Sequence, residues 1–122
     1  MTVQQITLQG TSYPILFGYG ALLDYETRFG TDPLEDLRSQ KSLARVTVQV
    51  AYAGLSNGQF ARDKTTPFAL SVQEVGNLIS EPGKIDEIMT LFSESMPKAE
   101  ADEEKKPTAA KAGATAQASG SN

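Results

Sequence analysis

Apolar and polar residues alternate twice near the start of the chain, over residues 3–8 and again over residues 13–17. Alternation with a period of two puts every second side chain on one face of a strand. Gly10 lies between the two segments and has the backbone freedom that a tight turn needs. We therefore expect a β-hairpin, with Ile6 and Leu8 on one face. Pro14 lacks an amide hydrogen, so its position should face outward at the border of a sheet of two or three strands.

After residue 20 the apolar period changes to three or four residues, which is typical of amphipathic helices. Leu22, Leu23 and Phe29 indicate a short helix that Gly30 closes. The segment Asp32-Pro33 with Glu35 contains an N-cap residue, a first-turn proline and a glutamate three residues after the cap, which together predict a helix start.

The middle of the chain allows more than one interpretation. Apolar residues at positions 43, 46, 50 and 53 favour a helix that runs down to Gly54, and either Ser39 or Ser42 could cap a restart. Valines at 46, 48 and 50 also alternate as in a strand, which stays open as the alternative. Residues 56–66 are polar, contain Gly58 and a charged run, and are expected to be mostly loop or helix end.

Two further helices are predicted before residue 97. Ser71 and Glu74 have the spacing of a capping box, and apolar positions 85, 88, 89, 92 and 96 mark one face of a final helix. Residues 97–122 contain no aromatic residue and no aliphatic residue larger than alanine, so we expect a disordered tail there. The predicted fold class is α+β: a domain over residues 1–96, in which an N-terminal β-hairpin packs with a bundle of three or four helices.

Composition narrows the possible functions. The 122 residues include no cysteine and no histidine, which excludes disulfides, thiol nucleophiles, Ser-His hydrolases and the usual ligands of zinc, copper and haem. Eleven basic against fifteen acidic residues give a formal net charge of −4, which disfavours nucleic acid as a partner. The sequence contains no apolar run of eighteen residues or more, so it predicts no membrane-spanning helix. We expect a cytoplasmic protein.

Two patterns invite a chemical interpretation, and neither supports one. Gly18-Tyr19-Gly20 precedes a helix as phosphate-binding loops do, but no third glycine or following lysine accompanies it, so we interpret it as a strand-to-helix turn. Acidic residues at 24, 26, 86 and 87 fall on predicted solvent faces of helices, and those at 100–104 lack the spacing of a calcium loop. We expect no catalytic residue, cofactor site or metal site.

Aromatic residues offer a more useful signal, because surplus rings on a surface serve as binding hot spots. Four of them lie at turns or off the best apolar faces, and these are the candidate partner-binding residues: Tyr19, Tyr25, Tyr52 and Phe60.

The order of segments is similar to that of a known family. The stretch of residues 13–22, followed by Tyr25-Glu26 and Phe29-Gly30, resembles the opening of the tail assembly chaperones of long-tailed bacteriophages and prophages. Residues 51–55 resemble that family's mid-chain helix end, and residues 71–75 with 85–92 resemble its final helical pair. The resemblance covers about residues 5–96. The polar connection at 32–42 and the insertion at 56–67 depart from the family pattern.

The resemblance implies a function without enzymatic residues. Such a protein binds the long, helix-rich tape measure protein, keeps it soluble, helps to recruit tail tube subunits in the host cell cytoplasm, and is absent from the mature virion. Self-association is a further expectation, because a core this small benefits from a partner. The alternative is a permanent structural component of the virion, such as a tail-completion or connector protein.

Overall fold

The computed structural model describes residues 2–39 and 42–95 of the chain. This part contains one two-stranded antiparallel sheet and five helices, which confirms the predicted α+β class but not the predicted three or four helices. The tail expected at 97–122 lies outside the described residues. The elements are β1 (Gln4–Leu8), β2 (Thr11–Ile15), α1 (Tyr19–Phe29), α2 (Pro33–Arg38), α3 (Leu43–Arg62), α4 (Val72–Leu78) and α5 (Lys84–Ser95).

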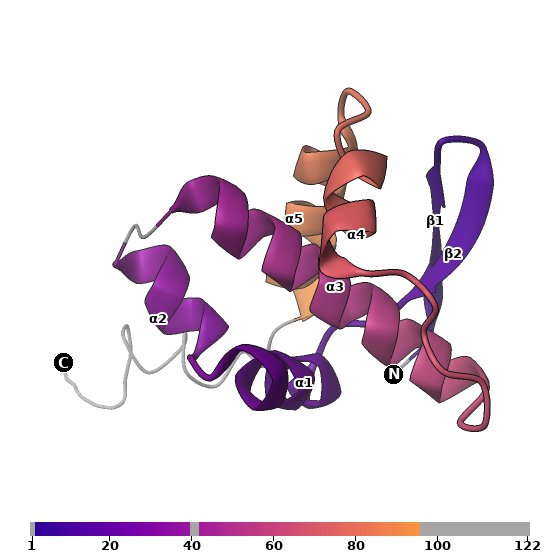
Figure 1. The fold of residues 1–122 in the computed structure, drawn as a ribbon, viewed down its shortest axis with the longest axis horizontal. Coiled ribbons are helices and arrows are strands. Elements are labelled where there is room, and N and C mark those ends of the chain that lie inside the picture. The colour runs from indigo at the N-terminus through magenta and orange to yellow at the C-terminus, as the bar shows by residue number, and fades with distance from the viewer. Residues whose placement is uncertain (1, 40–41, 96–122) are drawn as a thin grey trace, which may run out of the picture.

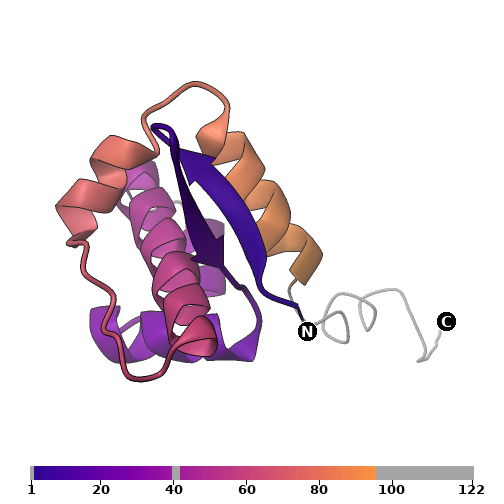
Figure 2. The same cartoon turned by 90° about the vertical axis from the view of Figure 1, so that its right-hand side faces the viewer.

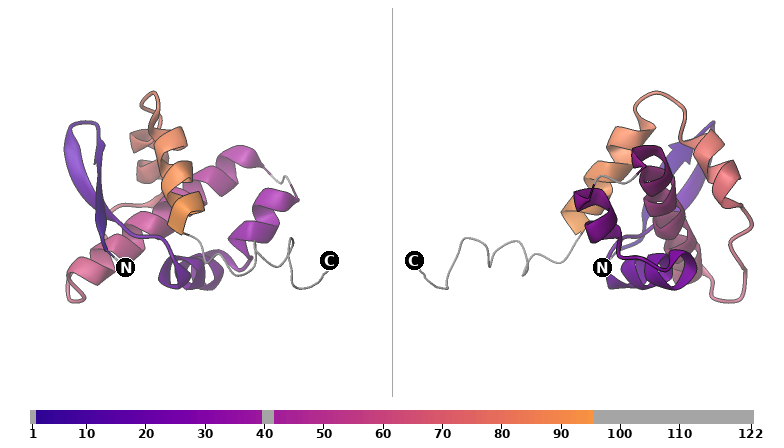
Figure 3. Two further views of the ribbon diagram at one scale, coloured as in Figure 1. Left: turned by 180° about the vertical axis from the view of Figure 1, so that it is seen from behind. Right: turned by 60° about the vertical axis from the view of Figure 1, so that its left-hand side comes forward.

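Helix α3 runs through the middle of the molecule, and the other elements are arranged around it (Figure 1). The hairpin lies near its C-terminal half, with α4 on one side of the hairpin and α5 on the other (Figure 2). The connection between α4 and α5 passes beside the hairpin tip. Seen from behind, α5 lies across α3, whereas α1 and α2 lie at the opposite edge of the molecule from that connection (Figure 3).

The hairpin has the turn that its sequence predicts. Leu8 pairs with Thr11 across a two-residue loop, in which Gln9 and Gly10 both have positive φ angles, of 52° and 83°. This is the backbone of a type I′ turn, whose twist matches that of the strands. Ile6 and Leu8 are buried, as expected.

Pro14 also lies where its chemistry requires. It is opposite Gln5, at a position that alternates with the hydrogen-bonded pairs, so its nitrogen faces away from β1. That outer edge of β2 is covered by α3. The amide of Leu16 donates to the carbonyl oxygen of Gly54 at 3.0 Å, and the Asn57 side-chain amide donates to the Leu16 carbonyl at 3.1 Å.

Two glycines let α3 approach the sheet this closely. A Cβ atom on Gly58 would lie 2.6 Å from the backbone nitrogen of Ile15, and one on Gly54 would overlap the ring of Phe17. Both glycines are inside α3, so the predictions of a helix end at Gly54 and of a mainly loop structure from residue 56 are wrong as far as Arg62. The helical interpretation of residues 46–50 is confirmed.

Local capping signals explain most helix boundaries. Gly30 ends α1 with φ at 82°, and the Asp32 carboxylate caps α2 by accepting from the amide of Leu34 at 2.9 Å. Ser42, not Ser39, caps the start of α3. Ser71 and Glu74 form the expected capping box of α4.

The core lies between the inner face of the hairpin, α1, α3 and the last two helices. Phe17, which follows β2, meets Phe92 of α5 edge to face, with ring centroids 5.3 Å apart. The contact between these two rings therefore joins the N-terminal part of the described chain to its C-terminal part. The buried apolar side chains are Ile6, Leu8, Ile15, Phe17, Ala21, Tyr25, Val46, Val50, Ala51, Tyr52, Ala53, Leu55, Val75, Ile79, Ile88 and Phe92.

Candidate functional site

Of the four predicted partner-binding aromatic residues, two are exposed and two are buried. Tyr19 and Phe60 expose 69% and 56% of their surface, whereas Tyr25 and Tyr52 expose 1% and 7%. The prediction that Tyr25 and Tyr52 are available to a partner is therefore wrong. Tyr19 and Phe60 stay candidates.

Tyr25 is buried because it lies on the same face of α1 as Ala21, the face that packs against α3. Its hydroxyl lies 2.9 Å from the Oδ2 atom of Asp36 in α2 and 3.0 Å from the Oε1 atom of Gln49 in α3. The Thr31 hydroxyl donates to the same Asp36 oxygen at 2.6 Å. A polar cluster thus joins three helices. The sequence gives no sign of it, because Asp36 follows Glu35 and resembles a solvated helix position.

This cluster holds the Tyr25 hydroxyl in its protonated form. Burial is the largest cause that raises the pKa of Tyr25 above the usual value of 10, and the hydrogen bond to Asp36 adds to it. Both effects disfavour a phenolate, the first by removing water and the second by placing a carboxylate beside the oxygen. Tyr25 therefore serves the structure, as a neutral hydrogen-bond donor in the core.

Tyr52 is buried within a row of aromatic rings. It meets Phe29 of α1 at 6.2 Å and Phe68 of the connection before α4 at 5.2 Å, both edge to face. The guanidinium carbon of Arg28 lies 4.9 Å from the centre of the Tyr52 ring, which adds a cation–π contact. These contacts fix the connection between α3 and α4 against the body of the protein.

The exposed apolar residues Tyr19, Leu23 and Phe60 lie on α1 and on the C-terminal part of α3. Leu23, which exposes 65% of its surface, is one helical turn after Tyr19 and so lies on the same face of α1. A Cβ atom on the adjacent Gly20 would lie 2.8 Å from the Asn57 side chain, and Phe60 follows Asn57 by three residues. The first turn of α1 therefore lies beside the part of α3 around Asn57. We call these three residues the α1–α3 apolar surface.

Leu23 was not among the sequence-derived candidates, because its spacing assigned it to the apolar side of the helix. Leu43 was assigned in the same way, and the structure leaves 71% of it exposed in the first turn of α3. Leu43 lies at the other end of α3 from Phe60. The spacing of apolar residues in the sequence does not distinguish Leu23 and Leu43 from buried apolar residues on the same helices. Helices α1 and α3 bury only the part of each apolar stripe that packs against another element.

Two grooves lie on other faces of the described residues. One, of about 450 Å³, lies between the hairpin and α4 and is lined by Gln9, Tyr13, Leu70, Glu74, Asn77 and Leu78. The other, of about 420 Å³, follows α5 and is lined by Asp86, Met89, Thr90, Ser93 and Glu94. Both are wide, open depressions, a shape that suits a macromolecular surface better than a small ligand.

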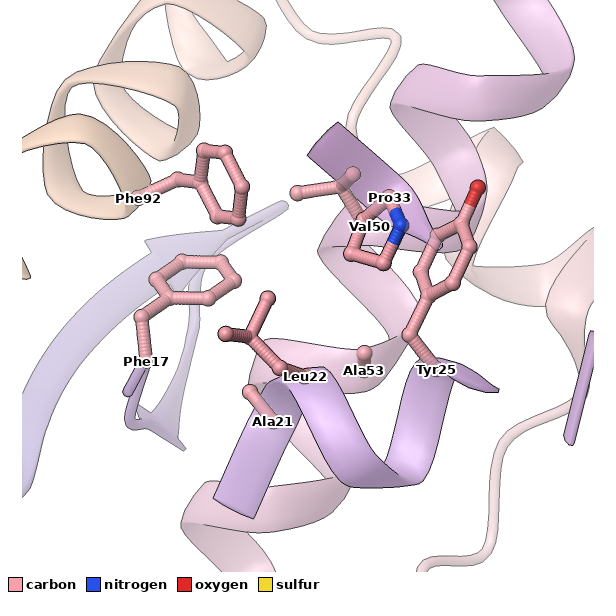
Figure 4. A pocket seen from close by; sticks show the side chains of 8 residues that line it. All are labelled: Phe17, Ala21, Leu22, Tyr25, Pro33, Val50, Ala53 and Phe92. Carbon is pink, nitrogen blue, oxygen red and sulfur yellow. The ribbon is translucent and has the colours of Figure 1, made fainter. Parts of the chain in front are cut away.

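A narrow gap lies beneath α1 and α2, where eight side chains converge (Figure 4). Its volume is about 10 Å³, and its lining comes from Phe17, Ala21, Leu22, Tyr25, Pro33, Val50, Ala53 and Phe92. This is about the volume needed for one water molecule, and the walls are apolar, so the gap should stay dry. It is too small to hold a substrate.

The acidic positions considered for chemistry lie on separate helices and make local contacts. Asp24 pairs with Arg28 on α1 at 3.3 Å, and Glu87 pairs with Lys84 on α5 at 3.2 Å. Gly18-Tyr19-Gly20 forms the turn that leads from β2 into α1. Within residues 2–39 and 42–95, no group of three or more acidic side chains is placed to hold a metal ion.

None of the described helices has both the length and the apolar character to cross a bilayer.

Comparison of the chain with protein-family models, with curated proteins and with solved structures finds no match.

Proposed function

We propose that this protein is a tail assembly chaperone of a long-tailed bacteriophage or prophage. In this role it binds the tape measure protein in the host cytoplasm, keeps it soluble and helps to recruit tail tube subunits, then stays out of the mature virion. It acts through non-covalent contact and not as an enzyme. The proposal rests on the family resemblance of residues 5–96 together with one structural observation, the α1–α3 apolar surface.

This surface has the properties of a binding site for amphipathic helices. Tyr19, Leu23 and Phe60 each expose more than half of their surface to solvent. Large apolar side chains exposed to solvent are unfavourable in water, and a partner's apolar stripe can cover them. Tyrosine and phenylalanine also lose little conformational entropy on binding, because each has only two side-chain torsions.

The test is co-expression with a tape measure protein. We expect the chaperone to raise the soluble yield of the tape measure protein and to co-purify with it. The triple variant Tyr19→Ala, Leu23→Ala, Phe60→Ala should lose both effects while it keeps its fold, since these side chains contribute little to the core. Each truncated hot-spot residue should weaken binding by about 2 kcal/mol.

Leu43→Ala provides the matched control, because Leu43 is as exposed as Tyr19 but lies at the other end of α3. It should leave the soluble yield and co-purification unchanged. An unchanged yield of the tape measure protein with the wild-type chain, and no co-purification, would contradict the chaperone function. Stoichiometric peptides of this chain in purified virions would instead support the structural component named above as the alternative.

A further inference from the structure

The outer edge of β1 presents backbone groups that the hairpin does not use. Gln4, Ile6 and Leu8 occupy the hydrogen-bonded positions opposite β2, so the amides of Gln5 and Thr7 point to the other side of the strand. Gln9 continues this alternation. Its amide also faces outward, and it donates to the Oε1 atom of Glu81, 2.9 Å away in the connection between α4 and α5.

Within the described residues, the hydrogen bond to Glu81 lies at the tip of this edge. No hydrogen bond to the backbone of Gln5 or Thr7 accompanies the one made by Gln9, and both side chains are exposed. The opposite edge of the sheet is different, because α3 covers it at Leu16 and Pro14. Exposed edge strands usually carry a lysine, a proline or a bulge that prevents pairing. β1 reads Gln-Gln-Ile-Thr-Leu and has none of these.

We propose that the outer edge of β1 pairs with the same edge of a second copy of the chain. The two strands run antiparallel about a two-fold axis at Ile6, so that Gln5 of each copy is opposite Thr7 of the other. The two hairpins then form one four-stranded sheet, with both Ile6 side chains on its inner, apolar side. This inference does not depend on the proposed chaperone function.

Charge does not oppose a second copy at this edge. Each chain carries a formal net charge of −4, so two copies repel wherever acidic surfaces meet. The first charged side chain in the sequence is Asp24, which leaves the hairpin free of charged side chains. Strand β1 is therefore a place where two copies can meet without like charges opposite each other. Its edge is also self-complementary, because an antiparallel pair needs the same donor and acceptor spacing on both strands.

The short strand limits the strength of this contact. Five residues extend over about 17 Å, and the Glu81 contact blocks extension of the pairing beyond Thr7. An interface of this length lies at the weak, transient end of protein association. The dimer should therefore dissociate on dilution and be visible only when the chain is concentrated.

The experiment is sedimentation equilibrium on the full chain at concentrations from about 1 µM to about 1 mM, the range of weak association. The wild-type mass should rise from 13.1 kDa towards about 26 kDa, twice that value. The double variant Gln5→Lys, Thr7→Lys places lysines directly opposite each other twice across the proposed pair and should stay at 13.1 kDa. Ser12→Lys, on the same outer face but on β2, is the matched control and should dimerise like the wild type.

A charge-swap experiment separates pairing from a general effect on folding. Gln5→Glu, Thr7→Glu should also be monomeric alone, whereas an equimolar mixture with the lysine variant should form a heterodimer. Thr7→Pro removes one outward amide without touching the β1–β2 ladder, as Pro14 does on β2, and should abolish the dimer. A wild-type chain that stays monomeric up to 1 mM would overturn the proposal, as would a lysine variant that dimerises like the wild type.

Discussion

Gly58 of α3 lies directly against the backbone of Ile15 in β2, with no side chain between the helix and the strand. An added Cβ atom would be 2.6 Å from the Ile15 nitrogen, a distance that real Cβ contacts essentially never show. Because the neighbouring atoms belong to the backbone, they cannot move aside as a flexible side chain would. The position of the hairpin on α3 therefore depends on a hydrogen atom at residue 58.

Gly58→Ala should lower the free energy of unfolding by about 2 kcal/mol, because overpacking of this kind costs about 1–3 kcal/mol. The measurement is urea denaturation followed by circular dichroism. Gly76→Ala in α4 is the matched control, since its Cβ would lie 3.6 Å from the methyl groups of Val48. That variant should gain about 0.5–1 kcal/mol from helix propensity alone. Equal effects of the two substitutions would contradict the close approach at Gly58.

The buried hydroxyl of Tyr25 should make the protein sensitive to alkaline pH. Its pKa is raised in the folded state, chiefly by burial and then by Asp36. Above pH 10 the unfolded chain therefore loses a proton that the folded chain keeps. This contribution to stability is complete below pH 10 and falls as the pH rises beyond it. Urea denaturation between pH 8 and about 11.5 should show the loss.

Tyr25→Phe serves as the control for the alkaline experiment. This variant should be less stable at pH 7, since Asp36 loses a hydrogen-bond donor, but its stability should fall less steeply above pH 10. Tyr19→Phe changes an exposed ring and should keep the wild-type pH profile. A wild-type slope in Tyr25→Phe would show that another group causes the alkaline loss.

Asp63 should titrate well below an ordinary aspartate. The hydroxyls of Thr66 and Thr65 donate to its carboxylate at 2.6 and 2.7 Å, and these bonds lower its pKa from 3.8 to about 2. The stability that these bonds add is complete above pH 4 and is lost as the pH falls through 2. An NMR titration of the Asp63 carboxyl carbon should give this midpoint. In the variant Thr65→Val, Thr66→Val the midpoint should return towards 3.8, and an unchanged midpoint would contradict the assignment.

The capping box of α4 should contribute measurably to stability. The Glu74 amide donates to the Ser71 hydroxyl at 3.1 Å, and the Ser71 amide donates to the Glu74 carboxylate at 2.8 Å. Ser71→Ala should lower the free energy of unfolding by about 1 kcal/mol. Ser42→Ala removes a longer single bond, 3.3 Å to the amide of Arg45, and should cost less in the same denaturation assay. If Ser42→Ala lowers the free energy of unfolding more than Ser71→Ala does, the capping box at Ser71 is not the stronger of the two caps.

The features that sequence predicted well are those determined by a few adjacent residues. Gly30 ends a helix because its positive φ is permitted there, and Asp32 with Pro33 starts one because the cap and the fixed φ act locally. The capping box of Ser71 is local in the same sense. The alternation of residues 3–8 and 13–17 predicted the hairpin because each strand exposes one face to water.

The features that sequence missed depend on contacts between distant segments. Gly54 and Gly58 resemble helix breakers until the strand that packs against them is known, which is why α3 extends beyond its predicted end. Tyr25 is an exception, because its spacing from Ala21 and Phe29 could have indicated burial. Tyr52 could not be placed without Phe68, and of the candidate surface only Tyr19 and Phe60 were anticipated.

The contact between Phe17 and Phe92 also has a consequence for biosynthesis. The hairpin is translated before the helices, and the ring that covers Phe17 is translated 75 residues after it. Until then the inner side of the hairpin has no lasting cover on the nascent chain. The domain should therefore complete folding only after Phe92 has been translated, and a truncation before residue 92 should yield a polypeptide that cellular proteases degrade quickly.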